Sequence, residues 1–260
     1  MPGKIGGVAL AHFVSSNGRI AGEATITRVD DSAYYILSAA SAELRDLDHL
    51  IAGKQEDDDV TIKNVTDQRG DIVLAGPRSR DVLAKLTDAD LPNAAFPWLT
   101  PQEISINGAP VRALRINYVG ELGWELHPAN EHMSDLYDAL WQAGEEAGIR
   151  DVGLYAVNSL RMEKAYRGWG AELTNEVTLQ DADMARFDHR DESQRQGDKS
   201  SGYRLVYLDV AATDSDVRGG EPVYLDGRCG GASTSGAYGH YTGKSLSFAY
   251  VESEQAKAEK

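Results

Sequence analysis

Apolar and polar residues alternate in several short stretches of the chain, a pattern that is typical of β-strands with one buried face. Over residues 18–38 this two-residue period predicts a pair of strands. The period recurs over 103–126, where Asn107 and Gly108 have the composition of a tight hairpin turn. The same pattern predicts further strands over 60–65, 71–75 and 203–251.

A helical period is clearest over residues 131–147, which Gly148 is expected to terminate. The apolar positions of this helix recur at the spacing of one face; they are Met133, Leu136, Tyr137, Leu140 and Trp141. Weaker periodicity predicts a helix over 41–52 with Ser41 as its cap, and another over 153–166. A short helix is expected to start at Pro77.

The order of these elements predicts an α+β fold followed by a small β unit. Residues 187–202 are almost entirely polar, so we interpret them as a linker or an exposed loop. The predicted organisation is therefore a main domain over 1–186, the polar linker over 187–202 and a C-terminal β unit over 203–260.

Composition narrows the classes of function. The 260 residues carry a net charge of −15, which argues against nucleic acid and against anionic membrane surfaces as partners. No apolar run approaches the roughly 20 residues that a membrane span needs, and the first residues lack the core of a signal peptide, so we expect a cytoplasmic protein. Cys229 is the single cysteine, and no two of the six histidines have i, i+4 spacing; we expect no metal site.

Three segments of the sequence carry a resemblance to a known family. They are YVGELGWE at Tyr118–Glu125, NSLRMEKAYRGWG at Asn158–Gly170 and STSGAYGHYTGKSLSFAYV at Ser233–Val251. Together they resemble the folate-binding part of dimethylglycine dehydrogenase, sarcosine dehydrogenase and dimethylglycine oxidase. The chain also resembles, more distantly, the T-protein of the glycine cleavage system.

This resemblance implies an aminomethyltransferase-like cloverleaf fold that holds tetrahydrofolate, with a small C-terminal β-barrel-like unit. It further implies transfer of a one-carbon unit from an N-methylated amine, or its iminium, to give 5,10-methylenetetrahydrofolate. In the dehydrogenases a separate flavin domain makes the iminium. The present sequence has no GxGxxG signature, so we expect the flavin-dependent dehydrogenase to be a partner subunit.

The resemblance assigns Glu163 to the pterin, whose amino group and ring N–H a carboxylate can accept side by side. The alternative is an exposed helical glutamate paired with Arg167 at i+4. Around Glu163 we expect Tyr155 to pack on the pterin, and Met162 and Lys164 to flank the pocket. Arg204 is a further candidate for folate binding, and an exposed charge at a strand edge is its alternative.

Glu23 takes the place of the family's catalytic aspartate, after a turn that reads Gly18-Arg19-Ile20-Ala21-Gly22. A carboxylate at this position can stabilise a cationic iminium and accept a proton. The alternative is a strand residue that faces solvent.

The chain departs from the family at both ends. Complete relatives carry roughly a hundred further residues before the motif KIG, by resemblance, so we expect the cloverleaf and its barrel to be truncated. Two other functions stay open. One is a non-catalytic folate-binding or interaction module, and the other is a folate-dependent O- or S-demethylase.

Overall fold

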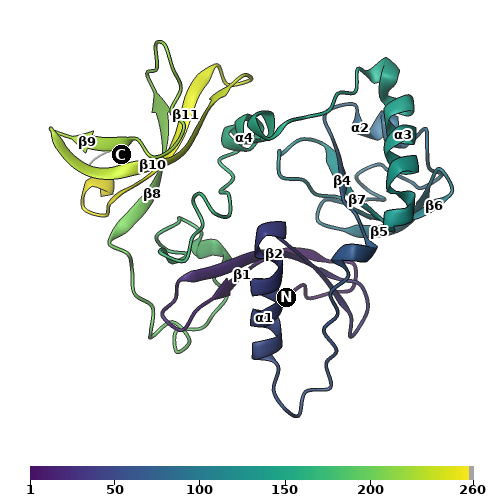
Figure 1. Cartoon of the computed structure of the whole chain (residues 1–260), viewed down its shortest axis with the longest axis horizontal. Helices are drawn as coiled ribbons and strands as arrows, with labels where there is room; N and C mark the ends of the chain where they lie inside the picture. The colour runs from purple at the N-terminus through teal and green to yellow at the C-terminus, as the bar shows by residue number, and fades with distance from the viewer. Residues whose placement is uncertain (258–260) are drawn as a thin grey trace. The chain divides into compact units, whose positions relative to one another are not determined.

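The computed structural model describes residues 1–257, whose helices and strands interleave along the chain (Figure 1). The strands are β1 (Val8–Val14), β2 (Ile20–Arg28), β3 (Tyr34–Ser38), β4 (Ile72–Ala75), β5 (Pro101–Ile106), β6 (Ala109–Leu114), β7 (Gly123–Pro128), β8 (Tyr203–Val210), β9 (Pro222–Leu225), β10 (Arg228–Gly239) and β11 (Lys244–Glu252). The α-helices are α1 (Glu43–Gly53), α2 (Ser79–Leu83), α3 (Met133–Gly144) and α4 (Leu154–Glu163). This mixture confirms the predicted α+β class.

The chain divides into two compact units. Unit 1 comprises Met1–Ala9 and Thr25–Asp151, and unit 2 comprises Leu10–Ala24 and Val152–Lys260. The division runs through β1 and β2, which join β3 in a sheet of order β1-β2-β3.

Unit 1 contains an antiparallel sheet of order β4-β7-β6-β5. The β5–β6 hairpin turns at Asn107 and Gly108, whose φ angles are 49° and 84°. Positive φ at both central residues is what a type I′ turn requires, and Asn-Gly is the pair that adopts it most readily. The hairpin predicted from these two residues is therefore confirmed.

Helix α3 packs its apolar stripe into the core of unit 1. Leu136 and Leu140 are 2% and 3% exposed, and they join a buried cluster that includes Trp124 and Phe96. Short 3-10 turns extend the helix at both ends, and Gly148 terminates it with a φ of 74°. The helix predicted over 131–147 is thus confirmed. Its apolar period matches the buried face, and Gly148 ends it as expected.

Two predictions in unit 1 are wrong. Residues 60–65 form no strand; the Asn64 side chain instead accepts from the Thr66 N–H and donates to Glu43, so local polar contacts replace a sheet partner. Helix α1 starts directly after a 3-10 turn over Ala40–Ala42. Its N-cap is Ala42, and Ser41 lies inside the turn and does not cap the helix. Strand β1 was not predicted.

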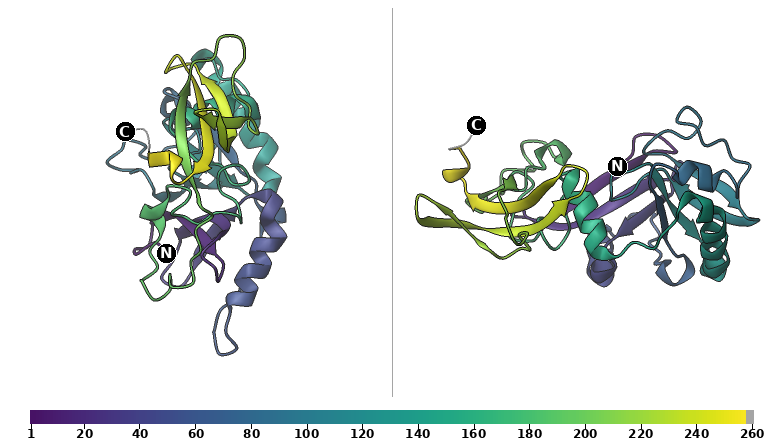
Figure 2. Two further views of the ribbon diagram at one scale, coloured as in Figure 1. Left: turned by 90° about the vertical axis from the view of Figure 1, so that its left-hand side faces the viewer. Right: turned by 90° about the horizontal axis from the view of Figure 1, so that it is seen from above.

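Unit 2 contains a second antiparallel sheet of order β8-β11-β10-β9, drawn from green to yellow in Figure 2. The sheet is curved but not closed into a barrel. Helix α4 packs on β10, where Asn158 Nδ2 donates to the Gly236 carbonyl at 3.0 Å and Ser159 Oγ to the Tyr238 carbonyl at 2.6 Å. These contacts fix the C-terminal half of α4 against the sheet.

Residues 187–202 form turns and one end of a short 3-10 helix. Arg190 joins the carboxylates of Asp188 and Asp198 at 2.9 and 2.7 Å, so the segment is tied by its own charges. The compact units do not follow the predicted boundaries at 186 and 203, and the three-part domain organisation stays a proposal. Among residues 1–257, no helix is long and apolar enough to cross a membrane.

Candidate functional site

Glu163 is the last residue of α4, and its carboxylate is held by the backbone of a distant turn. Oε1 accepts hydrogen bonds from the N–H groups of Tyr241 and Thr242, at 2.7 and 3.0 Å. These residues lie in the turn between β10 and β11. Glycine at position 239 leaves room for this approach, since a Cβ there would lie 2.9 Å from Oε1 and 2.4 Å from Thr242 Oγ1. Backbone N–H groups therefore fix the carboxylate, and no charged side chain among residues 1–257 pairs with it.

The second carboxylate oxygen of Glu163 is the available one. Within residues 1–257 no hydrogen bond to Oε2 is found, and the residue is half-buried. An ionised carboxylate has about four lone-pair sites, and two of them are used by the turn. The remaining lone pairs lie mainly on Oε2. A ligand with two adjacent N–H groups could therefore donate to this oxygen.

Tyr207 is a neighbour of Glu163 that the sequence did not suggest. Its hydroxyl donates to the Met162 carbonyl at 2.5 Å, and its ring lies 4.9 Å from that of Phe248. Burial raises the pKa of Tyr207, and the nearby charge of Glu163 raises it further. This aromatic ring, 41% exposed, therefore adjoins the carboxylate. The alternation of YRLVYLDV was the available signal, because it places Tyr207 and Leu205 on one face of β8.

The four other residues expected around the pterin differ in exposure and in position. Lys164 follows Glu163 at the helix C-cap and is exposed, and Arg204 is exposed on β8. Tyr155 is 95% exposed in the first turn of α4, about 12 Å from Glu163 along a helix axis. It therefore does not share one ring-sized site with Glu163.

Met162 does not line a surface that a ligand can reach. Its side chain is 0% exposed and packs with Leu205, Leu246 and Phe248. The expectation of a pocket-wall role is corrected here, because adjacent helix positions point about 100° apart and Met162 faces the sheet. Its packing against the sheet anchors the end of α4, where Glu163 lies.

Glu23, the candidate catalytic carboxylate, lies in the middle of β2 and is 19% exposed at its side chain. Its Oε2 is 2.9 Å from Nε2 of His12 on β1. The imidazole is 1% exposed and meets the Phe187 ring edge-on at 5.9 Å. The other ring nitrogen, Nδ1, is buried and has no hydrogen-bond partner among residues 1–257. Because a carboxylate oxygen accepts, we place a hydrogen on Nε2 and assign His12 as the donor to Glu23.

The motif around Glu163 also contains a buried ion pair. Arg161 Nη1 donates to Glu172 Oε2 at 2.8 Å and Arg161 Nη2 to Ser235 Oγ at 2.7 Å. Glu172 is 0% exposed and also accepts from the Gly168 N–H. Part of NSLRMEKAYRGWG is thus structural, since these contacts fix the end of α4 to the sheet and to the loop after it.

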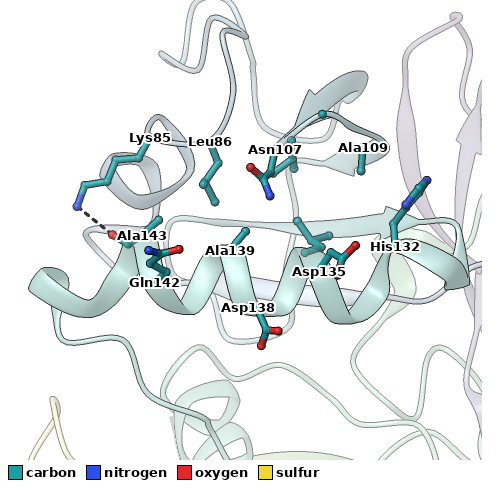
Figure 3. A pocket seen from close by; sticks show the side chains of 13 residues that line it. Lys85, Leu86, Asn107, Ala109, His132, Asp135, Asp138, Ala139, Gln142 and Ala143 are labelled. Carbon is teal, nitrogen blue, oxygen red and sulfur yellow. Dashed lines mark hydrogen bonds between the residues drawn. The ribbon is translucent and has the colours of Figure 1, made fainter.

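Two pockets are lined by none of the six candidate residues. One, of about 670 Å³, lies in unit 1 between α3 and the β5–β6 turn (Figure 3). Asp135, Asp138 and Gln142 line it from the helix, and Asn107 from the turn. The other, of about 690 Å³, lies in unit 2 beside Tyr203, Cys229 and Tyr250. The volume of a pocket does not identify a ligand. Neither pocket is lined by the carboxylates of Glu23 and Glu163.

Comparison with known protein families covers nearly the whole chain. The model of the GCVT N-terminal domain matches residues 1–191, and that of the glycine cleavage T-protein C-terminal barrel domain matches residues 204–260. Mitochondrial dimethylglycine dehydrogenase from Homo sapiens is 37% identical over 261 residues, which cover 95% of this chain and 30% of that protein. An aminomethyltransferase from Koribacter versatilis (strain Ellin345) is 29% identical over 92% of this chain and 65% of that protein.

A solved structure shows the same fold. The crystal structure of glycine cleavage system aminomethyltransferase T from Bartonella henselae matches with a TM-score of 0.78 and 21% identity, over 96% of this chain and 69% of that one. The present chain therefore spans less than a third of the dimethylglycine dehydrogenase, and about two thirds of the aminomethyltransferases, that it resembles.

Proposed function

The chain belongs to the glycine cleavage T-protein family, and from this premise we propose that it binds tetrahydrofolate and transfers a one-carbon unit to it. The observation that carries the proposal is the geometry of Glu163, whose Oε1 is fixed by the N–H groups of Tyr241 and Thr242. The carboxylate is immobilised, while Oε2 stays available to the amino group and ring N–H of a pterin. Hydrogen bonds to an ionised carboxylate are stronger than hydrogen bonds between two neutral groups.

The donor in this proposal is an N-methylated amine that has been oxidised to its iminium. Nitrogen of the folate attacks the iminium carbon, the original C–N bond breaks, and the second folate nitrogen closes the methylene bridge. The amine leaves with one proton and one further proton is released, so the products are the demethylated amine, 5,10-methylenetetrahydrofolate and H⁺. A negative charge near the reacting atoms favours the cationic species, and Glu23 supplies such a charge.

The oxidation itself is assigned to a flavin-dependent dehydrogenase, as a partner subunit or a further domain. Support comes from the 37% identity to dimethylglycine dehydrogenase, of which this chain spans 30% of the length. Dimethylglycine- or sarcosine-type amines are the donors that this relationship favours. An O- or S-methyl donor is the alternative, and direct comparison of the donors in a turnover assay distinguishes the two classes.

Folate binding is tested by titration calorimetry of the wild type with tetrahydrofolate under anaerobic conditions, beside Glu163→Gln. Glutamine keeps an oxygen for the Tyr241 and Thr242 N–H groups but replaces Oε2 with an NH₂ donor. We expect the substitution to weaken binding by roughly 1.5–3 kcal/mol, the range for a hydrogen bond to a charged group. Glu192→Gln, an exposed carboxylate in the polar segment, is the matched control and should bind like the wild type.

Two results would change the proposal. If the wild type binds no tetrahydrofolate, or if Glu163→Gln binds as tightly as the wild type, then Glu163 does not hold the pterin. If the wild type binds tetrahydrofolate but gives no methylenetetrahydrofolate with an iminium-generating dehydrogenase present, then the chain is a non-catalytic folate-binding module.

A further inference from the structure

Three side chains with metal-binding chemistry meet on one face of the unit 1 sheet, and neither Glu23 nor Glu163 belongs to this cluster. Strand β4 pairs with β7 so that Ile72 lies opposite Leu126, and an isolated bridge joins Arg69 to Ala129 in the same register. Between these pairs the register places Asp71 opposite His127. Glu125 is two residues before His127 on β7 and therefore points to the same face.

The ligand-type atoms of these three residues are close together. His127 Nε2 lies 3.8 Å from Asp71 Oδ1 and 3.9 Å from Glu125 Oε2, and all three groups offer an atom within 4.8 Å of the others. The His127 side chain is 1% exposed, that of Glu125 17% and that of Asp71 43%. The cluster is therefore closed at the imidazole and open to solvent at Asp71.

The imidazole nitrogen that points into this cluster has no hydrogen bond. Nε2 of His127 is buried and has no partner within residues 1–257, although two carboxylates lie just beyond hydrogen-bond distance. Buried polar side-chain atoms without a partner are uncommon, and each one needs an explanation. An ion between the nitrogen and the two carboxylates supplies one, because it would serve as the partner of all three groups.

The nearby cations are already engaged. Arg69 Nη1 donates to the His127 carbonyl at 3.1 Å, and Arg112 Nε donates to Glu103 Oε1 at 2.5 Å. Arg112 also lies over the Tyr35 ring, with its guanidinium carbon 4.7 Å from the ring centroid. Within residues 1–257, neither arginine forms an ion pair with Asp71 or Glu125. The two acidic groups therefore share a partly buried site without a direct counter-ion there.

We propose that Asp71, Glu125 and His127 form a binding site for a divalent transition-metal ion. One imidazole and two carboxylates suit Zn²⁺, Mn²⁺ or Co²⁺ better than Mg²⁺ or Ca²⁺, which prefer oxygen ligands alone. Metal–ligand bonds of roughly 2.0–2.2 Å place neighbouring ligand atoms about 3–3.5 Å apart. The observed separations therefore require each side chain to move by less than about 1 Å.

The ion would leave coordination positions open at the exposed side of Asp71, where water or an anionic ligand can bind. Three protein ligands with an open position are the pattern of sites that exchange ligands, whereas structural zinc sites are filled by four. The ion would also join β7 to the residue that precedes β4, the edge strand of the sheet, so metal binding is expected to stabilise unit 1.

The proposal is tested on the whole chain after EDTA treatment and buffer exchange. Zn²⁺ and Co²⁺ are titrated by calorimetry, and Co²⁺ is followed by its visible absorption, which reports on nitrogen and oxygen ligands directly. We expect one ion per chain and a higher melting temperature with metal. Asp71→Asn is the first variant because its side chain is at the open rim; it should lower affinity at least about tenfold and alter the Co²⁺ spectrum.

Glu131→Gln is the matched control, because Glu131 lies 3.8 Å from His132 in the same unit but forms an exposed pair, with side chains 79% and 33% exposed. It should bind metal like the wild type. Glu125→Gln provides a second test inside the cluster. The proposal is overturned if the wild type binds no stoichiometric ion, or if folded Asp71→Asn and Glu125→Gln both keep wild-type affinity and spectrum. In that case a shared proton or a water molecule occupies the cluster.

Discussion

Nε2 of His12 lies 2.9 Å from Oε2 of Glu23, across the hairpin of β1 and β2. The contact orients the carboxylate that we propose as the catalytic one. A hydrogen bond from the imidazole holds the Glu23 side chain in one position. Such preorganisation matters because small misplacements of a reacting group reduce rates sharply.

Glu23→Gln is expected to separate catalysis from binding. The substitution keeps size and hydrogen bonding but removes the charge that would stabilise the iminium and accept a proton. The rate of methylenetetrahydrofolate formation should fall by about 10²–10⁴-fold, while the dissociation constant for tetrahydrofolate changes little. Turnover is measured with a donor-generating dehydrogenase and binding by calorimetry. Equal rates for the wild type and Glu23→Gln would make Glu23 a bystander.

His12 is expected to act as a positioning residue for Glu23. His12→Phe fills the buried space beside Phe187 but removes the donor, so kcat should fall roughly tenfold or more with KM nearly unchanged. His12→Gln restores an N–H donor and should recover part of the rate. If both variants lose the same activity in proportion to a loss of folded protein, the role of His12 is only structural.

The turn that holds Glu163 gives a stability prediction of its own. Glu163→Ala leaves the N–H groups of Tyr241 and Thr242 without their acceptor, and should lower the free energy of unfolding by about 1 kcal/mol. Glu163→Gln keeps the acceptor and should be nearly as stable as the wild type. Urea unfolding of the two variants checks this order. Equal stability of the two would show that the turn does not depend on the carboxylate.

Sequence patterns located most of the elements because their signals are local. The hairpin at Asn107 and Gly108 depends on two adjacent residues, and helix α3 depends on a period that repeats over three turns. Residues 60–65 show where this fails. Alternation of apolar residues says that a strand is possible, but a strand also needs a partner, and the Asn64 side chain satisfies local backbone instead.

The candidate site was predictable only in part, for a similar reason. The helix motif pointed to Glu163, but its anchor is a turn 78 residues further along the chain. Met162 seemed equivalent to its neighbours in the motif, whereas the helix turns it into the core. The His12–Glu23 contact and the Asp71, Glu125 and His127 cluster depend on strand pairing, which alternation does not specify until the partner is known.

The buried pair of Arg161 and Glu172 should be one of the most sensitive points of unit 2. Arg161→Met removes the guanidinium but leaves the Glu172 carboxylate, which is 0% exposed, without its cation. Breaking one side of such a pair costs roughly 3–5 kcal/mol. Thermal and urea unfolding should show this loss. The double variant Arg161→Met with Glu172→Leu should be less destabilised than the single one, and a single variant as stable as the wild type would contradict the prediction.

Asp181 is a buried carboxylate of unit 2 that is held by backbone and hydroxyl donors. It is 2% exposed, and it accepts from the backbone N–H groups of Ser201 and Thr178 at 2.9 and 3.0 Å and from Ser200 Oγ at 2.7 Å. Burial alone would raise the pKa of Asp181, but these hydrogen bonds outweigh it and lower the pKa below its usual value. The charged form of Asp181 is therefore more strongly stabilised in the folded chain than in the unfolded chain.

A lowered folded-state pKa gives stability that is fully present above the unfolded pKa of about 3.9 and is lost as pH falls through the folded value. Asp181→Asn removes the charge at every pH, so it should reduce the free energy of unfolding by roughly 1–3 kcal/mol at pH 5 and pH 7. The difference from the wild type should shrink near pH 3. Asp183→Asn, which affects an exposed pair with Arg167, should cost less than about 1 kcal/mol. Urea unfolding at the three pH values measures both variants, and a penalty for Asp181→Asn that is independent of pH would mean that geometry, not charge, is what Asp181 contributes.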